Sequence, residues 1–137
     1  MILSDRQLLL WARSNVTPYD PTCVNAASLD LRLSNEYIRL ETGRRHTSEY
    51  FVIAPNDAYL VSTLEYIKIP KDVAGMVCLK SSWMRRGLDI SSAGFLDPGW
   101  KGQITMMLYS HCTVAIRPGE RVVQLVLHEC FEPEHPY

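Results

Sequence analysis

The chain has 137 residues, of which 47% are hydrophobic and 21% are charged, and its formal net charge is −1. This length suits one domain, and we expect a single domain over residues 1–137. The near-neutral charge gives no reason to expect a nucleic-acid partner, and no apolar run reaches the roughly 18 residues of a membrane span.

The N-terminus is the one part of the chain whose pattern predicts a helix. Ser4 followed by Gln7 forms a capping-box pattern, and an apolar run begins at Leu8. We expect the helix to end before Thr17-Pro18, because the residue before a proline avoids helical dihedral angles. The same stretch makes a poor secretion signal, since an acid and an arginine precede only a short apolar run.

After the helix, turn signals recur along the rest of the chain. They are Thr42-Gly43, Pro55-Asn56-Asp57, Pro70-Lys71-Asp72, Pro98-Gly99 and Pro118-Gly119. Short runs rich in β-branched and aromatic residues lie between them, at 59–62, 76–79, 104–109 and 122–127. This rhythm predicts an all-β fold, a distorted barrel or jelly roll with a short N-terminal helix.

The four cysteines, Cys23, Cys78, Cys112 and Cys130, are spread along the chain without any Cys-x-x-Cys pair. Cys78 and Cys130 fall in strand-like apolar runs, where a reduced cysteine is usually a small buried hydrophobe. We therefore expect neither disulfides nor zinc, and we expect a cytoplasmic location.

The first segment with unusual polar residues is NAASLDLRLS, residues 25–34. Alternation puts Leu29, Leu31 and Leu33 on an inward face and Asp30 and Arg32 on an outward face. Taken alone, Asp30 is then an ordinary surface carboxylate.

The second segment is LKSSWMRRGL, residues 79–88. Lys80, Ser81, Ser82 and Arg85 concentrate the ammonium, hydroxyl and guanidinium donors that phosphate oxygens favour. If Ser81 begins a helical turn, backbone amides also point toward an anion. The alternative is a solvated basic loop.

The third segment is SSAGFLDPGWKGQITMML, residues 91–108. Its turn fixes Asp97 beside Trp100, and its glycines allow the backbone to approach a ligand closely. A carboxylate held in a pocket can orient and deprotonate a water, and an aromatic ring can pack on a sugar. Because Asp-Pro is also a favoured β-turn sequence, a plain turn is the alternative.

The fourth segment is RPGERVVQLVLHE, residues 117–129. Gln124 interrupts an otherwise apolar strand, and a buried polar group needs a partner. That partner is either a structural one in the core or a ligand.

In this order and spacing, the four segments resemble the dCTP deaminase/dUTPase superfamily, small β-barrel proteins that act on deoxynucleoside triphosphates. MILSDRQL and SLDLRL look like the opening of dCTP deaminases, and KSSWMRRGL resembles their Ser-Ser-Leu-x-Arg-x-Gly-Leu segment. AGFLDPGWKGQITMML is similar to a segment of bifunctional deaminase-dUTPases, and RPGERVVQLV is similar to the fourth motif of the family. The resemblance covers nearly the whole chain.

The resemblance implies catalytic roles for Asp97 and Ser81 and substrate-binding roles for Lys80, Ser82, Arg85, Gly94, Trp100 and Gln124. Asp97 would activate water for attack on the α-phosphate, and Trp100 would pack against deoxyribose. The backbone around Gly94 would read the pyrimidine. Mg²⁺ would be held mainly by the phosphates, with Asp30 as a candidate contact through water. The resemblance also implies a homotrimer with sites between subunits.

Two departures from the family pattern bear on the activity. From Gly102 the strand alternates, and Met107 stands where dCTP deaminases have the glutamate that handles protons. A thioether cannot act as a general base. The chain also stops at FEPEHPY, where relatives continue into a segment that closes over the phosphates.

Three interpretations therefore stay open. The leading one is a dUTP diphosphatase, which converts dUTP and water to dUMP and pyrophosphate. The second is a dCTP deaminase that makes dUTP. The third is a catalytically silent protein that binds nucleotides or partners on the same scaffold.

Overall fold

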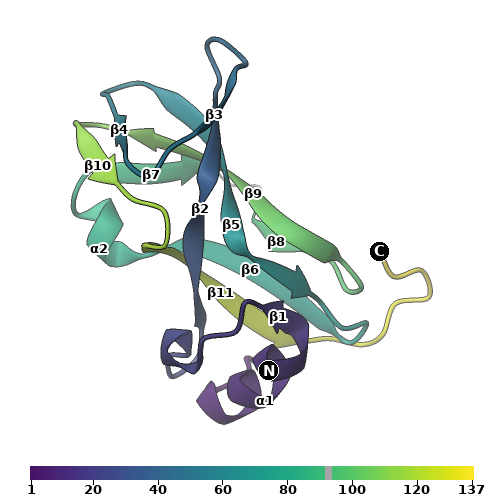
Figure 1. Ribbon diagram of the computed structural model, residues 1–137. Helices are drawn as coiled ribbons and strands as arrows, with labels where there is room; N and C mark the ends of the chain where they lie inside the picture. The colour runs from purple at the N-terminus through teal and green to yellow at the C-terminus, as the bar shows by residue number, and fades with distance from the viewer. Residues whose placement is uncertain (92–93) are drawn as a thin grey trace.

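The computed structural model, which describes residues 1–91 and 94–137, has one curled β-sheet with a helix at one end (Figure 1). The elements in chain order are α1 (Asp5–Asn15), β1 (Val16–Thr17), η1 (Pro21–Cys23), β2 (Leu29–Arg39), β3 (Arg45–Thr47), β4 (Phe51–Ile53), β5 (Ala58–Lys68), β6 (Val73–Leu79), α2 (Ser81–Met84), β7 (Leu88–Ser91), β8 (Phe95–Leu96), β9 (Lys101–Ser110), β10 (Val114–Ile116) and β11 (Arg121–Glu129).

The N-terminal helix α1 begins and ends where the sequence predicts. The Ser4 N–H donates to Gln7 Oε1 at 2.8 Å, one half of the expected capping box. Leu8 and Ala12 are fully buried, so this face of α1 packs against the end of the sheet. The Leu3 N–H also donates to the Leu127 carbonyl at 3.0 Å, which ties the helix entry to β11.

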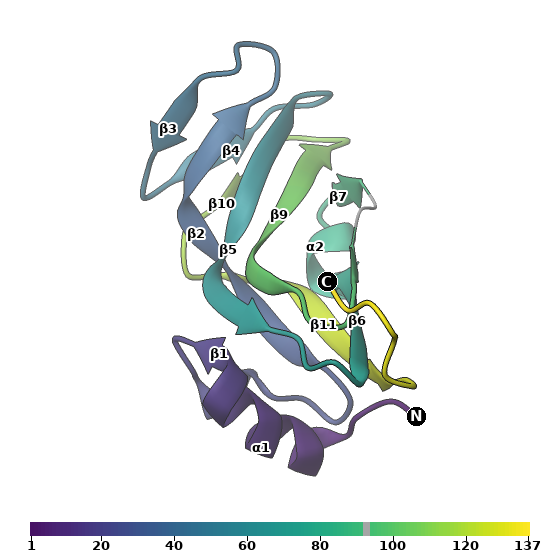
Figure 2. The same cartoon turned by 90° about the vertical axis from the view of Figure 1, so that its right-hand side faces the viewer.

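The large sheet runs in the order β7-β9-β5-β2-β11-β6-β8, with β1 added to β5 and β3 added to β2. Strand β11 lies antiparallel between β2 and β6, although these strands are far apart in the sequence. β4 and β10 form a separate two-stranded sheet. Figure 2 shows α1 at one end of the curled sheet, the β2–β3 hairpin at the other and α2 beside β7.

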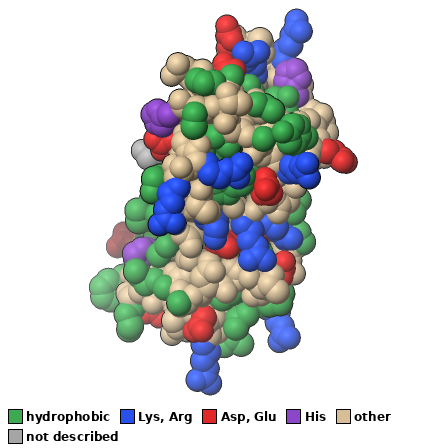
Figure 3. Space-filling model, turned by 90° about the vertical axis from the view of Figure 1, so that its left-hand side faces the viewer, with side chains coloured by type: hydrophobic (Ala, Val, Ile, Leu, Met, Phe, Trp, Pro, Cys, Tyr) green, Lys and Arg blue, Asp and Glu red, His purple; other side chains and the backbone are tan. Residues whose placement is uncertain are grey.

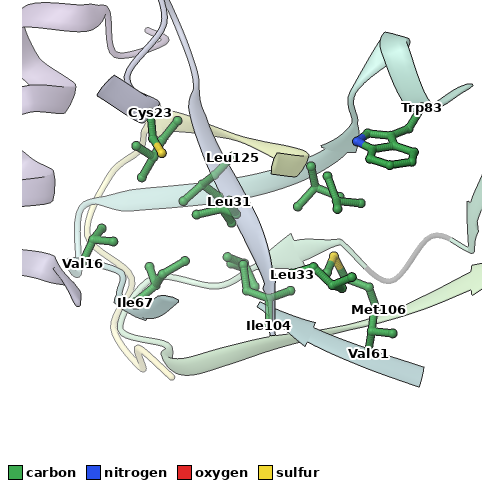
Figure 4. Close-up of a cluster of buried hydrophobic side chains, with 14 of the residues drawn as sticks. Val16, Cys23, Leu31, Leu33, Val61, Ile67, Trp83, Ile104, Met106 and Leu125 are labelled. Carbon is green, nitrogen blue, oxygen red and sulfur yellow. The ribbon is translucent and has the colours of Figure 1, made fainter. Parts of the chain in front are cut away.

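The core lies inside the curl of this sheet. Leu31 and Leu33 of β2 and Leu125 of β11 are fully buried, and they point into the same space as Ile104 and Met106 of β9 (Figure 4). All four apolar runs that the sequence predicts as strands lie in strands, namely β5, β6, β9 and β11. The expected all-β fold with a short N-terminal helix is therefore confirmed.

The cysteines do not all lie where the sequence predicts. Cys78 is exposed and Cys130 is only half-buried, whereas Cys23 is buried. The prediction that Cys78 is buried is wrong, because Cys78 lies opposite the polar, half-buried Gln124 on the outward face of β6 and not on the side that faces the core. All four cysteines are free thiols.

Among the helices of residues 1–91 and 94–137, none is long and apolar enough to cross a membrane.

Candidate functional site

A cluster of polar side chains lies where β2, β11 and the end of β6 meet. Asp30 of β2 pairs with Gln124 of β11, and Gln124 pairs on its other side with Cys78 of β6. Lys80 follows β6 directly and precedes α2. The members are Asp30, Lys80, Ser81, Ser82, Arg85, Arg121 and Gln124, and we call them the cationic cluster.

Asp30 is the buried centre of the cationic cluster, and the prediction that it is an ordinary surface carboxylate is wrong. Its side chain is only 3% exposed. Both of its oxygens accept hydrogen bonds from Lys80 Nζ, at 2.7 and 2.8 Å. Alternation along one strand shows only which face a residue takes, whereas the neighbouring segments decide whether that face is covered. Here Asn25, Lys80 and Arg121 cover it.

Arg32, which was also predicted to point outward, is partly buried against a second carboxylate. Its Nε donates to Glu65 Oε1 at 2.7 Å, and its backbone N–H donates to Glu65 Oε2 at 2.9 Å. Burial disfavours the charge on Arg32, but the hydrogen bond and charge of Glu65 outweigh it and raise the pKa of the guanidinium. This pair links β2 to β5.

The short helix α2 presents hydroxyl groups to solvent while its aromatic residue anchors it. Ser81 is the first residue of the helix, and Ser81, Ser82 and Arg85 are exposed. Trp83 is buried, and its Nε1 donates to the Arg121 carbonyl at 2.8 Å. Lys and Arg side chains gather across the middle of the molecular face on the α2 side (Figure 3).

Gln124 has a partner within the chain. Its Nε2 donates to Ser28 Oγ at 3.1 Å, and Ser28 Oγ also accepts from Asn25 Nδ2 at 3.3 Å. The Gln124 side chain is half-buried and retains a second N–H and a carbonyl oxygen. The structural and ligand-binding interpretations of Gln124 are thus compatible.

Asp97 lies on an exposed turn that joins β8 to β9. The Trp100 N–H donates to the Asp97 carbonyl at 3.1 Å, which closes a β-turn, and Gly99 in that turn has φ of +90°. Asp97 is exposed, whereas Trp100 is half-buried and packs within 3.1 Å of the position that a Cβ on Gly102 would occupy. The Tyr137 N–H reaches this turn and donates to the Pro98 carbonyl at 2.8 Å.

The chain does not bring Asp97 to the cationic cluster. Leu96, the residue before Asp97, lies opposite Gly75 near the start of β6, whereas Ser81 follows the end of β6. Ser81 lies six positions after Gly75, and a strand rises about 3.3 Å per residue, so the two sites are about 20 Å apart. Lys80, Ser81, Ser82, Arg85 and Gln124 gather at one end of β6, and Asp97 and Trp100 lie at the other.

Between these two sites lies an apolar pocket of about 300 Å³, which we call the Met107 pocket. Its described lining residues are Leu60, Val77, Ile90, Ser91, Gly94, Ile104, Thr105, Met106 and Met107, none of which is ionisable. The predicted alternation of β9 holds, since Met107 and Thr105 face outward while Met106 is buried.

Gly94 lines the Met107 pocket and packs tightly on β6. Its carbonyl accepts the Val77 N–H at 2.8 Å, and a Cβ on Gly94 would lie 2.9 Å from the Val77 carbonyl oxygen. This close approach requires glycine. The Gly94 carbonyl keeps a second lone pair beside the one that accepts from Val77, so it can also accept a hydrogen bond from a ligand.

Three polar residues in or next to the cationic cluster were not predicted from the sequence as site residues. They are Asn25, Ser28 and Arg121. All three lie in the quoted segments, but none interrupts an apolar run as Gln124 does. Arg121 Nη1 lies 3.7 Å from Asp30 Oδ2 and also donates to the Thr22 carbonyl at 3.0 Å. The signal available for Arg121 was a basic residue at the start of an apolar strand.

No group of three or more His, Cys, Asp or Glu side chains within the described part of the chain could hold a metal ion. The cationic cluster supplies ammonium, guanidinium and hydroxyl groups, and its single carboxylate is paired with Lys80. These groups suit phosphate oxygens rather than a bare cation.

Residues 2–130 match the family model described as dCTP deaminase-like. A Hydrogenobaculum protein named dCTP deaminase, dUMP-forming, is 38% identical over 143 residues, covering 92% of this chain and 81% of the relative. A protein of Sulfolobus islandicus rod-shaped virus 1, named probable deoxyuridine 5'-triphosphate nucleotidohydrolase, is 33% identical over 143 residues, covering 100% of this chain and 90% of the relative.

Two solved structures show the same fold at low identity. The dCTP deaminase of Agrobacterium tumefaciens superposes with a TM-score of 0.81 at 21% identity over 93% of this chain, which spans about half (48%) of that longer chain. The EIAV dUTPase superposes with a TM-score of 0.61 at 19% identity, covering 89% of this chain and 88% of that one.

Proposed function

The chain belongs to the dCTP deaminase-like family, and on this premise we propose that it is a dUTP diphosphatase that converts dUTP to dUMP and pyrophosphate. The observation that carries this choice is the Met107 pocket. None of the described residues that line it is ionisable, so the pocket suits a base that is held but not chemically changed. Hydrolytic deamination would need a proton-transfer group there.

The phosphate chemistry divides between the two ends of β6. The Asp97 carboxylate orients a water and takes its proton as the water oxygen attacks the α-phosphorus. The bond from that phosphorus to the bridging oxygen breaks, and pyrophosphate leaves. Lys80, Ser81 and Arg85 bind the triphosphate and stabilise the charge that develops on its oxygens.

Substrate recognition uses the remaining residues that the family resemblance implies. Ser81 also contacts the attacking water, Ser82 and Gln124 reach phosphate oxygens, and Trp100 packs against the deoxyribose. The base enters the Met107 pocket beside Gly94. The half-buried ring of Trp100 and the free N–H of Gln124 support these roles.

Magnesium and a second subunit complete the proposed site. Bound Mg²⁺ would be held by the triphosphate oxygens and would neutralise part of their charge, consistent with the donor set of the cationic cluster. A homotrimer with sites between subunits would bring Asp97 of one chain to Ser81 of another. The roughly 20 Å between these residues within one chain supports that arrangement. We place this activity in the cytoplasm.

The direct test measures pyrophosphate release from dUTP, with magnesium present, by a variant in which Asp97 is replaced. Asp97→Asn should lower pyrophosphate release by about 10²–10⁴-fold, because the amide cannot accept the proton of water. Asp72→Asn is the matched control, since Asp72 is another exposed turn carboxylate near the start of β6. Equal rates for the Asp97 variant and the wild type would rule out the proposed mechanism.

A dCTP deaminase is the second candidate, and the names of the relatives favour it. The Hydrogenobaculum relative is named for dCTP deamination that forms dUMP. An ionisable pair also lies two residues from Met107 along the sheet, where Tyr109 Oη donates to Asp89 Oδ2 at 3.0 Å. Ammonia released from dCTP, and lost in Asp89→Asn, would support this candidate.

A further inference from the structure

Asp30 has the most unusual environment of any side chain in the cationic cluster. A carboxylate that is 3% exposed is costly to bury unless it is paired and hydrogen-bonded. Asp30 meets this requirement with two bonds from Lys80 Nζ and one from Asn25 Nδ2 at 2.8 Å. The proposed hydrolysis does not use Asp30, so its burial needs a separate explanation.

The partner of Asp30 is the residue that starts α2. Lys80 is the N-cap of α2, and its backbone N–H donates to the Val122 carbonyl at 3.0 Å. An ammonium group has three donors, and two of them are directed at Asp30. The two bonds to Asp30 fix the position of the ammonium group and leave its third donor for a ligand.

Residues 25–30 orient a second substrate-binding side chain as well. Ser28 Oγ accepts from Gln124 Nε2 and from Asn25 Nδ2, and Asn25 Nδ2 also donates to Asp30. Lys80 and Gln124 come from different elements, and each is held by this one segment. Arg121 lies on the same carboxylate at 3.7 Å.

We propose that Asp30 is a positioning residue, which holds Lys80 and the start of α2 in the geometry that binds a triphosphate. This inference rests on the proposed function for the identity of the ligand. Asp30 acts through Lys80 and does not itself touch substrate or metal. The sequence-based suggestion that Asp30 contacts magnesium through water is a competing prediction, which the experiment below separates from ours.

The experiment measures binding of inorganic triphosphate to the full chain by calorimetry, with and without Mg²⁺. Asp30→Asn should weaken binding at least about tenfold in both conditions, because the charged hydrogen bonds that fix Lys80 are lost. Asp20→Asn is the matched charge control, since Asp20 accepts from Thr22 and does not contact Lys80. It should leave the affinity within about twofold.

A double-mutant cycle separates positioning from general damage to the fold. In a Lys80→Met background, Asp30→Asn should cause no further loss of affinity, because Asp30 then has no ammonium to position. Removing both charges leaves neither one buried and unpaired, so this double variant keeps the test available if Asp30→Asn alone fails to fold. The milder Asn25→Ala, which removes one bond to Asp30, should weaken binding a few-fold.

Four results would overturn the inference. They are an unchanged affinity in Asp30→Asn, a higher affinity, an equal loss in the Lys80→Met background, and a loss that appears only with Mg²⁺. The last of these would assign Asp30 to the metal. Failure of the proposed function looks different, because the wild type would then bind triphosphate but release no pyrophosphate from dUTP.

Discussion

Two side chains decide the proposed chemistry, and they face different surroundings. Asp97 is an exposed carboxylate on a hydrogen-bonded turn, which suits activation of water. Met107 is a half-buried thioether in an apolar pocket, which suits contact with a base ring. A carboxylate at Met107 would bring an ionisable group into the Met107 pocket, whereas methionine adds none to the described residues that line it.

The cysteines offer a residue-scale prediction. Burial raises the pKa of the Cys23 thiol, so less of it is thiolate at any given pH. Since the thiolate is the reactive species, Cys23 should be labelled much more slowly at pH 8 than the exposed Cys112. Peptide mapping after a short alkylation of the folded protein measures both sites.

Denatured protein provides the control for this experiment, because the two thiols should then react at similar rates. Rapid labelling of Cys23 in the folded protein would contradict the structure around η1.

At the scale of single residues, the sequence predicted which polar residues belong to the candidate site better than it predicted whether their side chains are buried. Asp30 and Cys78 have side chains of opposite polarity, and both lie opposite Gln124. Asp30 is buried by Lys80, and Cys78 is exposed. A period of two along one strand carries no information about what covers its outward face, so neither outcome could be obtained from local pattern.

At the scale of elements, α2 is held by one aromatic anchor. Trp83 is buried, its Nε1 donates to the Arg121 carbonyl, and the guanidinium of Arg86 lies 4.4 Å from the centroid of its ring. This anchor fixes α2 beside β11 although the helix has only four residues. The hydroxyls of Ser81 and Ser82 therefore keep a defined direction.

Trp83→Phe tests this anchor. The phenyl ring keeps most of the packing but cannot donate to the Arg121 carbonyl, so the free energy of unfolding should fall by about 1 kcal/mol. Urea unfolding measures this change, and binding of inorganic triphosphate should weaken in parallel. Tyr66→Phe, at an exposed aromatic position, is the control and should change the free energy of unfolding by less than about 0.5 kcal/mol. Unchanged stability in Trp83→Phe would mean that α2 is held by other contacts.

The elements themselves were largely predictable, and their pairing was not. The capping pattern at Ser4 located α1, and Pro-Gly and Asn-containing turns located the strand ends. The insertion of β11 between β2 and β6 depends on contacts between distant segments. Local turn chemistry specifies where a strand ends but not which strand it joins.

At the scale of the whole molecule, the curled sheet divides the candidate site. The cationic cluster and the Asp97 turn lie at opposite ends of β6, about 20 Å apart by strand rise. The register of β8 on β6 separates these residues within one chain, and the family resemblance implies sites between subunits. The trimer itself stays a proposal.

Complementation between two inactive variants tests whether a site combines two chains. Asp97→Asn and Ser81→Ala should each be inactive alone. Co-expressed at equal levels, they should regain about a quarter of the wild-type activity, because about a quarter of random pairs at a shared interface combine two intact halves. Pyrophosphate release from dUTP by the mixed assembly is the measurement.

The matched control mixes wild-type chains with chains that carry both substitutions. It checks that the two kinds of chain combine at random in the assembly. Mixed single variants that stay inactive while this control is active would contradict a site shared between chains.

The central claim is that this chain hydrolyses the phosphate chain of dUTP and leaves the base unchanged. The most direct measurement is an end-point assay with magnesium, in which dUTP, dCTP and dTTP are supplied separately and nucleotide products, pyrophosphate and ammonia are all quantified. We predict dUMP and pyrophosphate from dUTP, with no ammonia from dCTP. Ammonia from dCTP would contradict the argument from Met107. If none of the three nucleotides yields a product, the chain would be assigned a role in binding without catalysis.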